Sequence, residues 1–131
     1  MRRRALGGLC LWLAGLAVFN AVGAWSAWET RPFLATLPLA VPPAYLIGRG
    51  AVWAAALAGA ALAVWRRWPG ARAGAGIVFG AYLACSWFER LVQAPASHVQ
   101  TTLVWALAVD ALSLAFVVYA VWPARPSLGK R

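Results

Sequence analysis

The stretch "LVWALAVDALSLAFVVYAVW", residues Leu103 to Trp122, is almost entirely apolar and has one carboxylate, Asp110, near its middle. About 20 helical residues are needed to cross the ~30 Å hydrocarbon core of a bilayer, and this stretch is long enough. It therefore predicts a membrane-spanning helix. An unpaired ion at the centre of such a helix costs about 2.5–3.5 kcal/mol on insertion scales, so Asp110 is expected to have a partner.

The composition of the whole chain fits the same class. Of its 131 residues, 63% are hydrophobic and 11% are charged, and the mean hydropathy is +0.71. A soluble domain carries roughly 25% charged residues, because its surface has to be wetted. The length suits one compact unit. We therefore predict a single membrane domain over residues 1–131.

Four segments of the chain are long enough to cross a membrane, and they cover approximately residues 5–28, 44–65, 73–92 and 99–122. In lipid they have to be helical, because each backbone donor and acceptor needs a partner within the segment. A proline-rich outer loop over 29–43 joins the first two spans, and a tight turn over 66–72 joins the next two. The predicted fold class is all-α: a polytopic integral membrane protein with a four-transmembrane-helix bundle.

The basic residues indicate how the bundle is oriented. Nine of the twelve lie on one side of the predicted four-span bundle: Arg2, Arg3, Arg4, Arg66, Arg67, Arg72, Arg125, Lys130 and Arg131. Three lie toward the other side: Arg31, Arg49 and Arg90. Because cytoplasmic loops carry an excess of Lys and Arg, both termini are predicted to lie in the cytoplasm of a multi-pass plasma or inner membrane protein. Short basic clusters between apolar runs do not predict a nucleic-acid partner.

The first span has a second interpretation. Its arginine-rich start, its apolar run and the small residues Val22, Gly23 and Ala24 are also typical of a cleavable signal peptide over residues 1–24. Cleavage would leave three spans with the same orientation. We expect the segment to be retained, because an apolar run that continues to Trp28 is long for a signal peptide.

Ionisable residues of three spans are predicted to meet in the outer half of the bundle. Arg49 and Glu89 each lie sixteen residues from the cytoplasmic end of their span, and Asp110 lies twelve residues from its own. At 1.5 Å per residue, Asp110 is about 6 Å deeper, which an arginine side chain can reach. Arg49 is therefore expected to pair with one or both carboxylates. The predicted cluster is Arg49, Glu89, Arg90 and Asp110, with Asn20, Tyr45 and His98 as possible additions.

Small residues at four-residue spacing indicate where helices pack closely in lipid. They are Ala51, Ala55 and Gly59 in the second span, and Gly76, Gly80 and Ala84 in the third. We expect them to join these two spans into a hairpin. Opposite the glycines, Tyr82, Ser86 and Glu89 form a polar stripe. In the fourth span, Asp110 and Ser113 share one side, and bulky residues such as Trp105 and Tyr119 lie on the other, which suits lipid.

The sequence carries little that indicates catalysis. It contains one histidine, which excludes a bis-histidine haem within one chain, and none of the usual hydrolase, metalloprotease or P-loop patterns. We predict neither an enzyme nor a metal or cofactor, although binding of a quinone, lipid or pigment stays open. The expected function is an accessory or structural subunit that associates laterally with a larger membrane complex or with itself. The alternative is a small transporter or ligand-binding protein that uses Arg49, Glu89 and Asp110.

The predicted topology can be tested by cysteine labelling in a background that lacks Cys10 and Cys85. A membrane-impermeant maleimide added from outside should reach a cysteine at Ser97, because the loop between the third and fourth spans is predicted to lie outside. It should miss a cysteine at Gly70, in the predicted cytoplasmic turn. The reverse labelling pattern would contradict the orientation.

Overall fold

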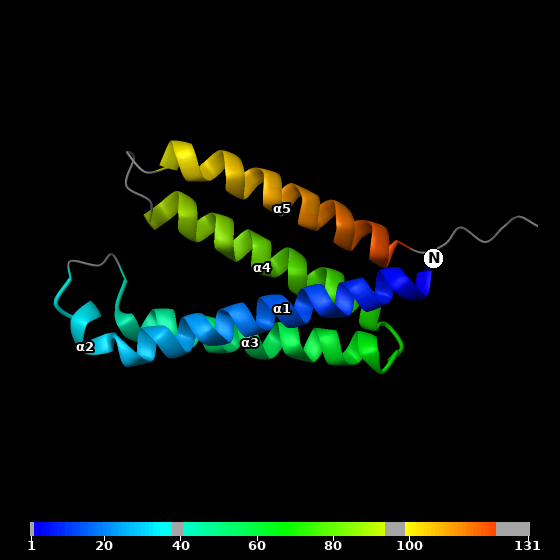
Figure 1. The fold of residues 1–131 in the computed structure, drawn as a ribbon, viewed down its shortest axis with the longest axis horizontal. Helices are drawn as coiled ribbons and strands as arrows, with labels where there is room; N and C mark the ends of the chain where they lie inside the picture. The colour runs from blue at the N-terminus through cyan, green and yellow to red at the C-terminus, as the bar shows by residue number, and fades with distance from the viewer. Residues whose placement is uncertain (1, 38–40, 94–98, 123–131) are drawn as a thin grey trace, which may run out of the picture.

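The computed structural model describes residues 2–37, 41–93 and 99–122, and this part of the chain is all-helical. Its elements are α1 (Arg2–Glu29), α2 (Arg31–Leu34), α3 (Pro43–Trp65), α4 (Ala71–Gln93) and α5 (Val99–Val121) (Figure 1). The bounds of the four long helices lie within three residues of the predicted segments. All four are long and apolar enough to cross a membrane.

Proline marks the start of α3, and two residues with left-handed backbone angles follow its end. Pro42 has extended backbone angles (φ −67°, ψ 149°), and Pro43 is the first residue of α3. Proline suits this position, because its fixed φ is already helical and its missing N–H would be unpaired there in any case. At the other end, Arg67 (φ 56°) and Gly70 (φ 76°) adopt left-handed conformations, which glycine reaches without a Cβ penalty. The chain can therefore reverse direction within a few residues.

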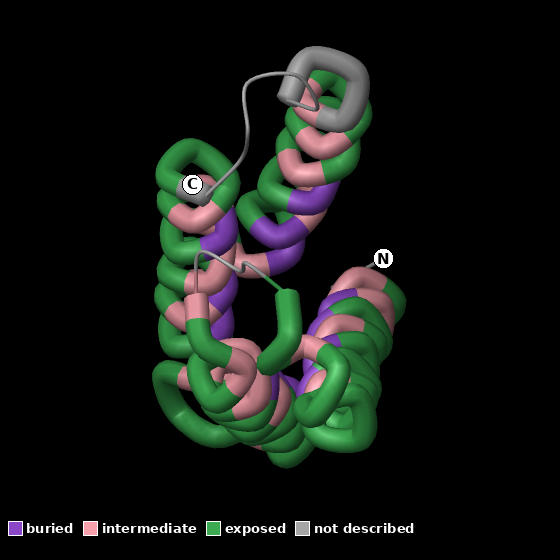
Figure 2. Tube along the Cα trace, turned by 90° about the vertical axis from the view of Figure 1, so that its left-hand side faces the viewer, coloured by how far each residue is buried: buried purple, intermediate pink, exposed green. Residues whose placement is uncertain are grey.

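The four long helices form an antiparallel bundle in which each helix lies beside the next along the chain, and α5 returns to α1 (Figures 1 and 2). One end of the bundle holds the start of α1, the turn between α3 and α4, and the end of α5; we refer to it as the turn end. The opposite end holds α2, and we refer to it as the loop end. In Figure 2, which looks along the bundle from the loop end, the buried residues face the centre.

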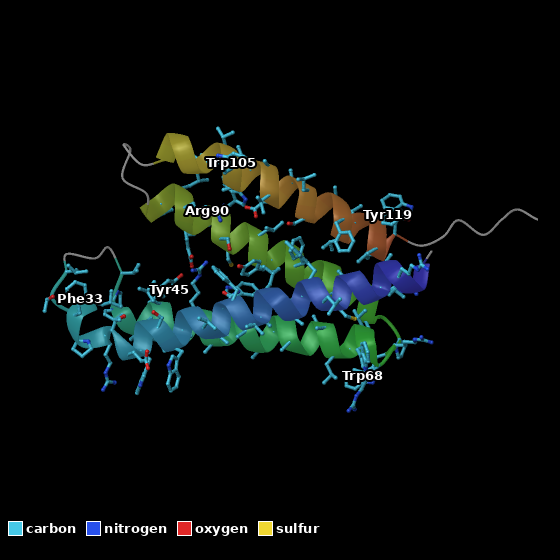
Figure 3. The ribbon with its side chains drawn as sticks, in the orientation of Figure 1. Phe33, Tyr45, Trp68, Arg90, Trp105 and Tyr119 are labelled. Carbon is cyan, nitrogen blue, oxygen red and sulfur yellow. The ribbon has the colours of Figure 1, made fainter. Side chains whose placement is uncertain are left out.

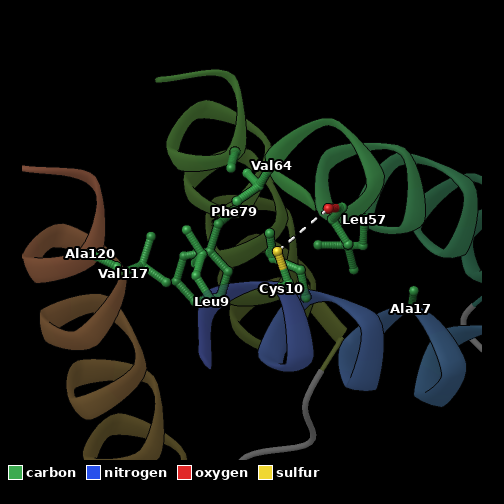
Figure 4. Close-up of a cluster of buried hydrophobic side chains, with 11 residues drawn as sticks. Leu9, Cys10, Ala17, Leu57, Val64, Phe79, Val117 and Ala120 are labelled. Carbon is green, nitrogen blue, oxygen red and sulfur yellow. Dashed lines mark hydrogen bonds between the residues drawn. The ribbon is translucent and has the colours of Figure 1, made fainter. Parts of the chain in front are cut away.

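The apolar core lies in the half of the bundle next to the turn end. Leu9, Leu13, Leu57 and Phe79 are its largest fully buried side chains (Figure 4). They come from the first half of α1, the second half of α3 and the first half of α4, and Val117 and Ala120 from α5 complete the cluster. Close van der Waals packing of these side chains stabilises this half of the bundle.

The backbones of α1 and α3 approach closely at Gly50, near the loop end. A Cβ placed on this buried glycine would lie 2.9 Å from the Cβ of Ala24 and 2.9 Å from the backbone oxygen of Asn20. Both contacts are to rigid atoms, so neither can move aside cheaply. Gly50 therefore acts as the small residue that lets two backbones meet, a role that the sequence pattern had indicated for other glycines.

The small residues that were expected to join α3 to α4 lie elsewhere in the structure. Ala51, Ala55, Gly59, Gly80 and Ala84 are exposed, and a Cβ at Gly59 or Gly80 would have nothing within 4 Å. Gly76 faces α5 instead, with its Cβ position 3.6 Å from Val121.

The polar side of α4 explains this difference. Tyr82, Ser86 and Glu89 face the other helices, and since Gly80 and Ala84 lie on the opposite side of α4, they have to face outwards. Larger side chains make the contact between α3 and α4. The rings of Trp53 and Tyr82, for example, meet edge to face with centroids 5.4 Å apart.

Replacing Gly50 with alanine should destabilise the protein, because the new methyl group overlaps Ala24 and the α1 backbone. Overpacking of this kind typically costs about 1–3 kcal/mol of unfolding free energy. The free energy can be measured by titrating the detergent-solubilised protein with SDS. Gly59→Ala is the matched control, because it adds the same group on the same helix in open space. Equal stability of the two variants would contradict the close approach of α1 and α3.

Candidate functional site

A cleft of about 410 Å³ opens among α1, α3 and α4 in the half of the bundle next to the loop end. Its walls carry most of the polar residues that the sequence singled out for the cluster. They are Phe19 and Asn20 from α1, Arg49 from α3, and Tyr82, Ser86, Glu89 and Arg90 from α4. We call this feature the polar cleft. Figure 3 labels Tyr45 and Arg90 at this end of the bundle.

The first ion pair of the site joins α3 to α4. Arg49 Nη2 lies 2.7 Å from Glu89 Oε2, and Tyr45 donates a hydrogen bond of 2.6 Å to Glu89 Oε1. Both oxygens of this carboxylate are therefore engaged by α3, and the Glu89 side chain is 13% exposed. The structure thus brings Arg49 together with one of the two expected carboxylates and adds Tyr45 to the cluster.

The second ion pair joins α4 to α5. Arg90 Nη1 lies 3.0 Å from Asp110 Oδ2, so the partner of Asp110 is Arg90 and not Arg49 as the depth argument had indicated. The reason is adjacency, since α5 packs mainly against α4 and α1. The Arg90 guanidinium also lies 5.3 Å from the centre of the Trp87 ring, within the range of a cation–π contact.

A third polar contact crosses the bundle from α1 to α4. Asn20 is buried, and its amide nitrogen donates to the Leu16 carbonyl at 2.8 Å and to the Tyr82 hydroxyl at 3.4 Å. Asn20 therefore joins the cluster as the sequence suggested. Ser113, on the inner side of α5, is buried and donates to the Val109 carbonyl of its own helix at 2.7 Å. His98 lies outside the described residues.

Donors and acceptors in the polar cleft are not balanced. Glu89 has a donor on each oxygen, and Asp110 receives Arg90. A guanidinium has five N–H donors, and the two arginines use few of them in these pairs. Arg49 Nε is buried and finds no acceptor among the described residues. The arrangement is therefore suited to accept an oxyanion. Within the same residues, no group of three or more His, Cys, Asp or Glu side chains could hold a metal ion.

A second cavity, of about 430 Å³, lies at the turn end. Its lining includes Cys10 and Val64 from the apolar core, together with Trp65, Trp68, Arg67 and Arg72. Both arginines are exposed, and none of the four residues of the two ion pairs lines this cavity. It is therefore separate from the polar cleft and offers a comparison site of similar size.

The described residues form an all-helical bundle with four helices long and apolar enough to cross a membrane, and with both ion pairs in the half next to the loop end. Comparison of the chain with protein-family models, curated proteins and solved structures gave no match. Its function has to be inferred from the chain's own residues.

Double-mutant cycles should separate the two ion pairs. Arg90→Ala and Asp110→Ala should each reduce the unfolding free energy, toward the lower end of the roughly 1–3 kcal/mol typical of a stranded polar partner, because both side chains are partly exposed. Their combined effect should be smaller than the sum, with a coupling of about 0.5 kcal/mol or more. The cycle of Arg49→Ala with Asp110→Ala should be additive, because these residues do not pair. Coupling in the second cycle and additivity in the first would contradict the pairing.

Proposed function

We propose that this chain is a membrane-embedded accessory or structural subunit, which associates laterally with a larger membrane complex or with a second copy of itself. The observation that carries this proposal is the outward face of α4. Gly80, Ala81 and Ala84 are exposed there, and the position of a Cβ on Gly80 meets nothing within 4 Å. In lipid, small residues of this kind let a helix from another chain approach closely.

The engagement of the charged residues within the chain supports the same proposal. Arg49 with Glu89, and Arg90 with Asp110, tie neighbouring helices together. Buried ion pairs often fix register and orientation more than they add stability. In this proposal the polar residues hold the subunit in shape, and the partner is recognised through its outer surface.

The proposal places the four helices across a cell membrane with both termini in the cytoplasm. Exposed arginines at the turn end support this orientation: Arg4, Arg66, Arg67 and Arg72. Exposed tryptophans near both ends of the bundle suit the two membrane interfaces. They include Trp65, Trp68 and Trp122 at the turn end, and Trp25 and Trp28 at the loop end, where Arg31 lies 4.3 Å from the centre of the Trp28 ring.

Lateral association can be tested through Cys85, which is exposed on α4 next to Ala84, whereas Cys10 is buried. A benzophenone maleimide attached to Cys85 should, on illumination in native membranes, form one adduct of defined mass. That mass should equal either twice the chain or the chain plus one membrane protein. Gly80→Leu should reduce this adduct by about tenfold, because a side chain on the interface separates the helices.

Folding and surface controls accompany this test. Gly80→Leu should unfold at the same SDS concentration as the parent, because the added side chain projects into open space. Gly15→Leu is the matched control, since Gly15 is an exposed helical glycine on α1 with nothing within 4 Å of its Cβ position. An equal loss of adduct in both variants, or no adduct in the parent, would contradict association through the α4 face.

A further inference from the structure

The polar cleft has properties that lateral association does not use. It is a concavity of about 410 Å³, within the range of small-molecule sites. Two arginines line it from different helices, and their side chains remain 30% (Arg49) and 46% (Arg90) exposed after pairing. In a bilayer, guanidinium groups that are not fully covered are costly, so a cleft of this kind is expected to hold water or a ligand.

The chemistry of the lining selects the class of ligand. Two guanidinium groups and one carboxylate, Glu89, face the cleft, and that carboxylate already accepts from Tyr45 and Arg49. A cationic ligand would meet both arginines and an acceptor that is already occupied. An oxyanion would meet unused N–H groups of the two partly exposed guanidiniums, and the Tyr82 hydroxyl on the same wall. Arginine is well suited to phosphate and carboxylate, because its planar fork can bind two oxygens at once.

The surroundings of the cleft indicate that this anion carries an apolar tail. Phe19 lines the cleft and is 71% exposed, and the neighbouring Val18 and Val22 on α1 are also exposed. A hydrocarbon chain can lie against these side chains in the lipid while the charged group sits inside. This placement requires that the helices lie in a membrane, as in the proposed function, but it does not require lateral association.

We propose that the polar cleft binds an amphipathic anion, with its phosphate or carboxylate group held by Arg49 and Arg90 and its tail beside Phe19. The interior beyond the cleft is closed. The rings of Trp53 and Tyr82 meet edge to face about one turn further toward the turn end. Beyond them lie the fully buried side chains of Leu13, Leu57 and Phe79. The cleft therefore captures its ligand from the loop end or from the adjacent lipid and does not conduct it through the bundle.

Isothermal titration calorimetry of the full chain in a neutral maltoside detergent tests this site. Dodecyl phosphate should bind with a stoichiometry of one, whereas dodecyltrimethylammonium, which has the same tail and the opposite charge, should show no saturable binding. Inorganic phosphate distinguishes a lipid-like ligand from a free anion and should bind at least about tenfold more weakly, because it lacks the tail. Equal affinity for inorganic phosphate would overturn the amphipathic assignment.

A paired substitution locates the binding site. Arg90→Gln with Asp110→Asn removes a guanidinium and its carboxylate together, so no charge is stranded in the bundle. Affinity for dodecyl phosphate should fall by about tenfold or more, the loss expected when one charge-assisted hydrogen bond is removed. The control is Arg67→Gln with Arg72→Gln, which removes two exposed arginines at the second cavity and should leave the affinity unchanged. A loss in the control with none in the cleft variant would overturn the proposal.

A second variant keeps the test decisive if the paired substitution fails to fold. Phe19→Ala changes an exposed side chain at the rim, so the fold should be retained. It should weaken dodecyl phosphate severalfold, because part of the tail contact is lost, and leave inorganic phosphate unaffected. Unchanged affinity for dodecyl phosphate would contradict the position of the tail. These outcomes are independent of the Cys85 adduct, so the ligand site and lateral association can fail separately.

Discussion

Polar and charged side chains among apolar helices need partners, and in this chain α4 provides one for each neighbouring helix. Glu89 receives Arg49 and Tyr45 from α3, Arg90 meets Asp110 of α5, and Tyr82 accepts from Asn20 of α1. In the proposed membrane setting, hydrophobic attraction between helices is nearly absent, so such contacts decide which helices stay together. These contacts set the rotation of α4 about its axis, and that rotation turns Gly80 and Ala84 outwards.

The two halves of the bundle are consequently stabilised in different ways. Next to the turn end, Leu9, Leu13, Leu57 and Phe79 fill the interior. Next to the loop end, Gly50 brings α1 and α3 into contact. There, α4 is joined to α3 by long polar side chains, such as Arg49 of α3 and Glu89 of α4. Arginine and tyrosine side chains span a wider gap than packed leucines do. A cleft at this end is therefore a consequence of joining helices through ion pairs.

Sequence reasoning predicted the helices well, because apolar length and proline positions act locally and need no knowledge of neighbours. It also placed the polar sides of α4 and α5 toward the protein. Depth along each helix, however, does not say which helices are adjacent. Arg49 was therefore expected to pair with one or both of Glu89 and Asp110; it pairs with Glu89, and Asp110 pairs with Arg90 of the adjacent helix. Spacing likewise could not distinguish a glycine that is covered, Gly50, from one that faces outwards, Gly80.

The two proposed surfaces lie on opposite sides of one helix. Tyr82, Ser86 and Glu89 face the cleft, and Gly80 and Ala84 face away from the bundle. A helix of 23 residues is a rigid element, so a change in how its inner side is held also affects its outer side. Occupation of the cleft would add acceptors to Arg49 and Arg90, the two cations that tie α4 to α3 and α5. A ligand there would therefore act on the contacts that fix the outward face of α4 in position for a partner.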